Sequence, residues 1–330
     1  MSLKKVRIEN YTGLKPLGIG KLDVLKSHQY KVESRYAITG DAPKEFIKVY
    51  EYGKGQRKIN QKSWSLYIAK TGHKWYPNES VMEYLLTRIG QILGLNIAEA
   101  RLIQAAGQVR YLSKYFLEPT QELVHGADIY AGFVADKDFV EQIETENRAR
   151  DFFTIQFTHQ ALLDRFPNHA EKLFQDFLQM LLFDAIVGNN DRHFYNWGII
   201  RDLTGKQTPY FSPIYDTARG LFWNESEQKI VTLHTDKNRL QNFLKKYTQN
   251  SMPKIGWEGQ KNLNHFELLR LLPTQQTLNN FKEILNVNKL ENCLTMIDNE
   301  FSFLFSSERR KLIKQCLKIR FQTLLNMTII

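Results

Sequence analysis

The feature that most constrains this chain is a polar segment that directly follows an apolar one. The run FLQMLLFDAIV leads into GNNDRHFYNWG, which spans Gly188 to Gly198. Polar side chains beside a core are costly unless they meet water, a metal or a ligand. The apolar run is typical of a buried central helix, so the polar segment is expected at the floor of a ligand-binding cleft.

Composition allows one large domain or two lobes with an ample core. The chain has 330 residues, of which 42% are hydrophobic and 24% charged, as in ordinary globular proteins. No apolar stretch is long enough to span a membrane, and the N-terminus lacks the apolar region of a classical signal peptide. Cys293 and Cys316 have no metal-ligand spacing, and we expect both to be buried thiols of an intracellular protein.

The chain is basic, with 45 Lys and Arg against 35 Asp and Glu and a net charge of +10. This balance favours acidic partners such as nucleotide phosphates, RNA or an anionic membrane. The densest basic run is SERRKLIKQCLKIRFQ, from Ser307 to Gln322. We expect it to be the solvated face of an amphipathic helix rather than a nucleic-acid site.

Hydrophobic patterning predicts a β-rich N-terminal lobe over residues 1–120. Short runs rich in β-branched and aromatic residues predict strands, and a helical repeat predicts a helix that ends near Gly94. A hairpin is expected to turn at Ala106–Gly107. The predicted strands cover 36–40, 44–52 and 64–70, and the predicted helix covers 80–95.

Residues 121–330 are predicted to form a mainly helical C-terminal lobe. Helices are expected over 146–166 and 168–187, and again beyond Asn224. Between them, a hairpin of strands over 197–200 and 209–216 carries polar residues. The fold class is therefore α+β with two lobes.

The parts needed for phosphoryl transfer from ATP occur in order along the chain. That chemistry needs a Lys for the phosphates, a Glu that fixes the Lys, an Asp for the acceptor hydroxyl, and an Asn and a second Asp for Mg²⁺. A Lys ends the strand WSLYIAK, and a Glu follows on the predicted helix. The polar segment then supplies Asp-x-x-x-x-Asn, and an Asp ends SPIYD. In chain order these residues are Lys70, Glu83, Asp191, Asn196 and Asp216.

Three stretches carry a resemblance to a known family. MEYLLTRIGQILGLNIAEARLI, LLFDAIVGNNDRHFYNWGII and YFSPIYD resemble the kinase core of the HipA family, the serine/threonine kinase toxins of bacterial toxin–antitoxin systems. The resemblance covers roughly residues 36–225. It implies a two-lobed protein kinase-like fold, shared with the phosphoinositide kinases, and ATP and Mg²⁺ as cofactors.

The resemblance also implies roles for the five residues that occur in this order along the chain. Asp191 would be the catalytic base, and Asn196 and Asp216 would bind Mg²⁺. Lys70 would contact the ATP phosphates and pair with Glu83.

Further ATP contacts are implied at two other places. AITGDAPKEF matches the phosphate-binding loop of the family, which makes Gly40 and Lys44 candidate phosphate contacts. SKYF matches the hinge, where backbone groups of Lys114 and Phe116 would meet adenine.

The chain departs from the family in its N-terminal part. The autophosphorylated serine of the loop falls at Ala37, and Thr39 is the obvious substitute. Asp41 and Pro43 make the loop more acidic and stiffer than a phosphate cradle needs. About 35 residues precede the loop, so the N-terminal subdomain of the full-length toxins is expected to be absent or supplied by a partner chain.

Residues beside the motif have structural interpretations as well as functional ones. We expect the His193 ring to hold the polar segment 188–198 or Asp216 in place through hydrogen bonds. We do not expect it to act as a base or a zinc ligand. Asp184, on the buried helix, is expected to brace the catalytic loop, since an unpaired carboxylate there would be costly. Arg219 fits a phosphate or a neighbouring carboxylate equally well.

The preferred hypothesis is a serine/threonine protein kinase in the bacterial cytoplasm, or one delivered into another cell by a non-classical route. The resemblance implies a protein substrate such as an aminoacyl-tRNA synthetase, and an antitoxin as partner. One alternative is a phosphoinositide-type lipid kinase, although TARGLFWNESEQK after Asp216 lacks a dense basic run. The other is a pseudokinase or nucleic-acid-binding module, which retention of all five residues disfavours.

The change from serine to Ala37 in the phosphate-binding loop generates a prediction about autophosphorylation. If the chain phosphorylates itself as its relatives do, the phosphate should lie between Tyr36 and Lys44, on Thr39. Mass spectrometry of protein incubated with Mg²⁺ and ATP checks this, and phosphate found only elsewhere would rule out Thr39.

Overall fold

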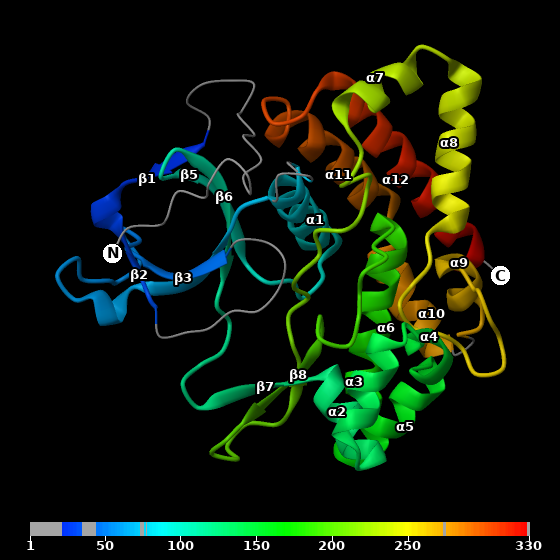
Figure 1. Cartoon of the computed structure of the whole chain (residues 1–330), viewed down its shortest axis with the longest axis horizontal. Coiled ribbons are helices and arrows are strands. Elements are labelled where there is room, and N and C mark those ends of the chain that lie inside the picture. Colours follow the sequence, from blue (N-terminus) through cyan, green and yellow to red (C-terminus); the bar gives the residue numbers. More distant parts are fainter. Residues whose placement is uncertain (1–21, 35–43, 73–75, 77, 273–274, 329–330) are drawn as a thin grey trace.

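The computed structural model describes residues 22–34, 44–72, 76, 78–272 and 275–328. It has an α+β fold with two lobes, as expected. Figure 1 shows strands β1 to β6 on one side, most of the helices on the other, and helix α1 between them. The expected strand over 36–40 falls in the phosphate-loop stretch, outside the described residues.

Among the described residues, six strands form the sheet of the N-terminal lobe in the order β1-β5-β6-β4-β3-β2. All neighbours are antiparallel except β1 and β5, which are parallel. The predicted hairpin turns at Ala106 (φ 51°) and Gly107 (φ 72°), where two positive φ angles suit the twist of the flanking strands. The strands are β1 Asp23–Leu25, β2 Tyr30–Val32, β3 Lys44–Val49, β4 Ser65–Lys70, β5 Ala100–Ala105 and β6 Gln108–Lys114.

Helix α1 (Glu79–Leu93) packs between the sheet and the C-terminal lobe. It ends as predicted at Gly94, whose φ of 80° is left-handed and therefore suits glycine. Its fully buried residues include Val81, Leu85 and Ile89, which recur at helical spacing. This packing fixes the direction in which Glu83, on the same helix, points.

A second sheet opens the C-terminal lobe. In the described chain its order is β7-β8-β9, with β7 Gln121–His125, β8 Gly198–Asp202 and β9 Tyr210–Phe211. Sequence patterning predicted β8 but not β7, whose five residues are each half-buried and show no clean alternation. Residues 115–120 connect the two sheets, and the proposed lobe boundary at 120/121 falls within this connection.

Helix α6 is the centre of the C-terminal lobe, as the apolar run predicted. It packs against α5, α9, α10 and α12, and Figure 1 shows it passing through the middle of the helical side. The helices are α2 Gly126–Val134, α3 Lys137–Thr145, α4 Ala149–Phe152, α5 Ile155–Arg165, α6 Ala170–Val187, α7 Glu227–His234, α8 Lys237–Asn250, α9 His265–Arg270, α10 Gln275–Ile284, α11 Val287–Glu300 and α12 Ser307–Thr328.

Two predicted elements differ from the structure. The strand expected over 209–216 is only two residues long, because Pro213 lacks an N–H group for a sheet and the chain leaves β8 there. The helix expected over 146–166 is split into α4 and α5. Thr154 starts α5 by accepting a hydrogen bond from the Phe157 N–H at 3.1 Å, an N-cap inside the apolar pattern.

The basic run lies on helix α12, but its prediction as a solvated face is wrong for two arginines. Arg309 and Arg320 are fully buried. Arg309 donates to the Phe222 carbonyl at 3.1 Å and to the Glu225 carbonyl at 2.5 Å. Arg320 donates to the Ala185 carbonyl in the last turn of α6 at 2.7 Å. These two charges therefore tie helix α12 to the rest of the lobe.

The remaining expectations about the helical lobe concern its thiols and its apolar helices. Cys293 and Cys316 are free and buried, as predicted, and burial raises the pKa of the Cys293 thiol to about 12. In the described part of the chain, no helix combines the length and the apolarity needed to cross a bilayer.

Replacing Arg309 with Ala should lower the free energy of unfolding by about 3 kcal/mol, because buried carbonyls lose their donor and a cavity forms. The matched control is Lys318→Ala on the same helix, which is exposed and should change stability by less than about 0.5 kcal/mol. Urea denaturation of both variants checks the difference. Equal stabilities would contradict the assigned role of Arg309.

Candidate functional site

Three of the predicted residues meet through charge. The Lys70 ammonium lies 2.7 Å from a Glu83 carboxylate oxygen and 2.9 Å from an Asp216 carboxylate oxygen. Lys70 ends strand β4, Glu83 lies on α1 and Asp216 follows β9, so the contact joins both lobes. The side chain of Glu83 is buried and that of Lys70 nearly so, at 3% and 12% exposed, whereas the Asp216 side chain is 41% exposed and faces a cleft.

The cleft sets cations among carboxylates, with Lys44, Lys70 and Arg219 against Glu79, Glu83, Asp191 and Asp216. Although burial disfavours a charged amine, the Asp216 and Glu83 carboxylates raise the pKa of Lys70. The Lys70 ammonium in turn holds the pKa of the Asp216 carboxyl well below its usual value. Lys44 is the direct cross-strand partner of Lys70 and lines the same cleft. Two cations thus converge where an anionic ligand can bind.

The polar segment 188–198, which we call the catalytic loop after its expected role, brings Asp191 and Asn196 to the same cleft. The Asn196 side-chain amide donates to the Asp191 carbonyl at 3.0 Å, and the His193 N–H donates to that carbonyl at 2.9 Å. These bonds close the loop on itself. All five residues predicted for phosphoryl transfer therefore line one cleft, although they are spread over 147 positions from Lys70 to Asp216.

A buried ion pair connects the catalytic loop to helix α6. Arg192 binds Asp184 through two hydrogen bonds of 3.0 and 3.1 Å, and both side chains are almost fully buried. A further nitrogen of Arg192 donates to the Asn196 carbonyl at 2.9 Å and the Tyr215 carbonyl at 2.6 Å. The predicted brace at Asp184 is confirmed, and Arg192 connects it to the segment that carries Asp216.

Sequence reasoning missed Asn189, although it lies inside the polar segment. Its side chain donates to Asp184 at 2.8 Å and accepts from the Asp191 N–H at 3.2 Å. Its carbonyl pairs with the ring of His265 on α9 at 2.9 Å. Burial lowers the pKa of His265 well below its usual value, so this ring is neutral and supports the loop through hydrogen bonding. Asn189 stands just before the Asp-x-x-x-x-Asn motif, and this position was the only sequence signal of its role.

Asp216 stands in an unusual backbone conformation, with φ of 53°. Left-handed geometry is uncommon outside glycine, and such positions gather at functional sites. Two adjacent anchors hold it there. The Tyr215 hydroxyl donates to the Tyr195 carbonyl at 3.0 Å, and Ile214 exchanges backbone hydrogen bonds with the segment that follows α1, at Asn96 and Ala98.

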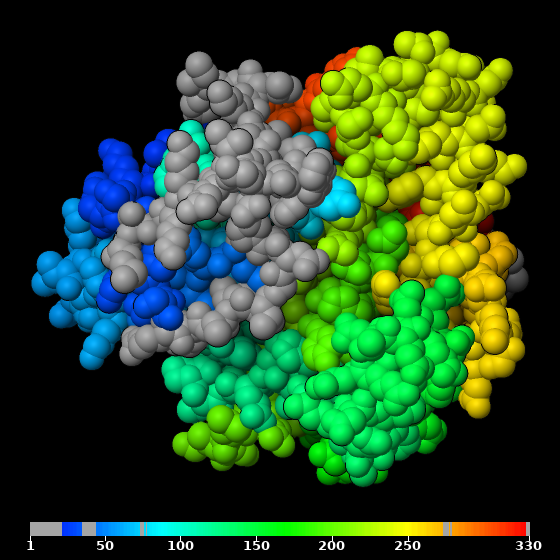
Figure 2. All heavy atoms as spheres, viewed as in Figure 1, coloured from blue at the N-terminus to red at the C-terminus, as the bar shows by residue number. Residues whose placement is uncertain are grey.

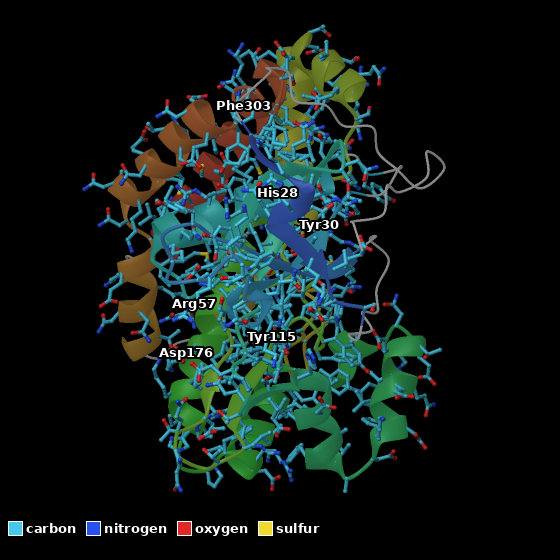
Figure 3. The ribbon with its side chains drawn as sticks, turned by 90° about the vertical axis from the view of Figure 1, so that its left-hand side faces the viewer. His28, Tyr30, Arg57, Tyr115, Asp176 and Phe303 are labelled. Carbon is cyan, nitrogen blue, oxygen red and sulfur yellow. The ribbon has the colours of Figure 1, made fainter. Side chains whose placement is uncertain are left out.

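The predicted hinge lies next to this segment. The Phe116 ring packs 5.7 Å from the Tyr215 ring. Figure 3 looks onto the N-terminal lobe and places Tyr115 at its lower part, toward the helical lobe. Lys114 donates its N–H to the Glu99 carbonyl at 2.8 Å, and its ammonium also binds Glu99. The adenine contact predicted for Lys114 therefore depends on its carbonyl group.

Other predicted residues have clear positions. Arg219 lies 3.2 Å from Asp191, so it pairs with a carboxylate, one of the two options left open. His193 accepts from the Tyr195 N–H at 3.3 Å, which confirms that it holds the loop. Gly40 and Thr39 lie outside the described residues.

The donor set suits a hard divalent cation. The Asn196 amide nitrogen is occupied by the Asp191 carbonyl, which leaves the amide oxygen as the group for a metal. Magnesium takes oxygen ligands and keeps several waters or phosphates. In the described part of the chain, no cluster of three or more His, Cys, Asp and Glu could hold a metal unaided. An ion bound at Asn196 and Asp216 would therefore complete its coordination with waters or ligand phosphates.

Comparison with known proteins places this chain in a family. The sequence matches the HipA-like C-terminal domain over residues 36–280. The chain belongs to this family. The serine/threonine-protein kinase CtkA of Helicobacter pylori is 23% identical over 233 residues, which make up 68% of this chain and 65% of that relative. The match thus spans just under two thirds of the relative's length.

Solved structures share the fold. The crystal structure of the Helicobacter pylori proinflammatory kinase CtkA has a TM-score of 0.69 at 18% identity, covering 90% of this chain and 94% of that one. The toxin–antitoxin protein HipA of Shewanella oneidensis, in complex with HipB and its operator DNA, has a TM-score of 0.52 at 14% identity, covering 90% and 67%. The predicted HipA-like, two-lobed α+β fold is confirmed.

The brace below the loop generates a stability prediction. Asp184→Ala should destabilise the fold by about 3–5 kcal/mol, because it leaves the Arg192 charge buried and unpaired. The control is Asp164→Ala at an exposed position on α5, which should cost less than about 0.5 kcal/mol. Chemical denaturation measures both. A loss below about 1 kcal/mol for Asp184→Ala would mean that the pair does not anchor the loop.

Proposed function

We propose that the chain is an ATP- and Mg²⁺-dependent serine/threonine protein kinase. The observation that carries this proposal is the contact of Lys70 with both Glu83 and Asp216. It assembles, across two lobes, the groups that phosphoryl transfer requires. Membership of the HipA-like family supports the proposal independently.

In this proposal Asp191 accepts a hydrogen bond from the acceptor hydroxyl and receives its proton. Arg219, 3.2 Å from Asp191, supplies positive charge beside the reacting oxygen. Because the transition state of phosphoryl transfer is loose, the proton need not leave early. Asp191 therefore acts mainly by orienting the hydroxyl.

Lys70 and Lys44 bind the phosphates of ATP, and Glu83 keeps the Lys70 ammonium in place. Asn196 and Asp216 hold Mg²⁺, which neutralises charge on the phosphates when bound. Phe116 and the Lys114 carbonyl form the side of the cleft that receives adenine, and Gly40 extends the phosphate contacts. The Phe116–Tyr215 packing supports this arrangement, because it links the hinge to the neighbour of Asp216.

The acceptor is proposed to be a protein hydroxyl. CtkA is named a serine/threonine-protein kinase, whereas the basic run expected of a phosphoinositide clamp is missing from the segment after Asp216. HipA is found with HipB, and a comparable antitoxin remains a prediction for this chain. An aminoacyl-tRNA synthetase as target, and a bacterial cytoplasmic or delivered location, also stay predictions.

Asp191→Ala and Asp216→Ala should each lower phosphate transfer by at least about 100-fold, through loss of proton acceptance or metal binding. The measurement is transfer from γ-labelled ATP with Mg²⁺, with candidate proteins and phosphoinositides offered as acceptors. Asp164→Ala, remote from the cleft, is the matched control and should transfer phosphate like the wild type.

Circular dichroism should show that both variants remain folded. Near-wild-type transfer by either variant would contradict its proposed role. Label on phosphoinositides alone would replace the protein acceptor with a lipid.

A further inference from the structure

A second hollow lies beside the catalytic loop and is separate from the cleft that Lys70 lines. It has a volume of about 420 Å³ and is lined by residues 147–151, 252–254, 256–257 and 260–263 together with Asn190, and we call it the basic pocket. Asn190 is exposed and directly precedes Asp191. The basic pocket therefore begins one residue from the proposed catalytic base.

The walls of the basic pocket are fixed to each other by the backbone. The Gly256 N–H donates to the Phe153 carbonyl at 3.2 Å, and the Ile155 N–H donates to the Gly256 carbonyl at 3.1 Å. A Cβ atom at Gly256 would lie 1.9 Å from the Arg150 carbonyl oxygen, so only glycine allows this approach. Figure 2 shows the two segments, green and yellow to orange, meeting on the helical lobe. The pocket is preformed.

The lining is strongly cationic. Its lining residues include four basic ones, Arg148, Arg150, Lys254 and Lys261, and one carboxylate, Asp151. Arg148 is paired with Glu146 at 3.2 Å, so the remaining positive charge comes from Arg150, Lys254 and Lys261. Trp257 adds a flat, half-buried apolar wall. Potentials of one sign inside a concave site attract ligands of the opposite charge.

Arg150 adds a positive charge that its own hydrogen bonds do not neutralise. Its guanidinium donates to the Met252 sulfur at 3.1 Å and to the Leu263 carbonyl at 2.7 Å, and both acceptors are uncharged. Burial lowers the pKa of Arg150, and Asp151 opposes this effect only in part. A partly buried charge without a bonded carboxylate is costly, and an incoming anion would offset that cost.

We propose that the basic pocket binds an acidic side chain of the acceptor polypeptide, close to the hydroxyl that is phosphorylated. This inference rests on the proposed kinase function and gives it a substrate preference: Asp or Glu near the acceptor Ser or Thr. The volume suits a side chain in a cavity rather than a polynucleotide strand, which runs along an open groove lined with several stacking aromatics. The contact positions the acceptor, and the chemistry stays at Asp191.

The first test compares two peptides that share one Ser and differ in having Glu or Gln on both sides of it. The wild type should prefer the Glu peptide by about 10-fold in kcat/KM, chiefly through KM, as charge-assisted hydrogen bonds imply. In the double variant Lys254→Ala, Lys261→Ala the preference should fall to about 2-fold or less. The matched control replaces Lys245 and Lys246, two exposed lysines of α8, and should keep the preference.

The second test measures binding without catalysis. In the Asp216→Ala protein, the Glu peptide should change the tryptophan fluorescence, and Trp257→Phe in that background should remove most of the change. The affinity should fall as salt is raised, because the contact is ionic. The Gln peptide should give a much smaller signal at the same concentrations.

The outcomes separate this inference from the kinase proposal. Equal kcat/KM for Glu and Gln peptides in an enzyme that transfers phosphate would overturn the basic pocket as a substrate site and leave the kinase function standing. Absence of any transfer would contradict the kinase function, and the fluorescence titration would still decide whether the pocket binds an acidic peptide. A fluorescence response to an RNA oligonucleotide but not to the Glu peptide would also overturn the inference.

Discussion

The site depends on one buried ion pair, between Asp184 at the end of α6 and Arg192 in the catalytic loop. Burying two charges is tolerated only when their remaining hydrogen-bonding groups are satisfied. Here Arg192 also binds the carbonyls of Asn196 and Tyr215. The pair therefore does more than close a loop, because it fixes Asp191 and Asn196 relative to the segment that presents Asp216. Asp216 in that segment then meets Lys70 across the lobes at 2.9 Å.

Local signals made the framework of the fold and the ordered site residues predictable. The helix before Gly94 could be predicted from the spacing of its apolar residues and from its C-terminal glycine. The hairpin at Ala106–Gly107 could be predicted from its turn residues. The order Lys70 to Asp216 was informative because each residue type has a separate chemical task. The structure places these residues together, and their roles in phosphate transfer remain proposals.

What could not be predicted depends on partners that are distant in sequence. Arg309 and Arg320 were predicted to be exposed, because the neighbouring sequence gives no sign of the distant carbonyls that accept their hydrogen bonds. Asn189 meets His265 across 76 positions, a pairing that no local pattern encodes. The Arg150 contacts that shape the basic pocket come from the loop before α9. In each case a tertiary partner decided whether a polar side chain faces solvent or the interior.

The contact between Arg320 and the Ala185 carbonyl bears on when the site is complete during synthesis. Domains fold largely as units while the ribosome extends the chain from its N-terminus. The last turn of α6, just before the catalytic loop, takes this hydrogen bond from a residue made 135 positions later. A nascent chain that already contains Asp191, Asn196 and Asp216 thus still lacks a support of its catalytic loop. The catalytic loop can therefore reach its finished geometry only after Arg320 has been synthesised.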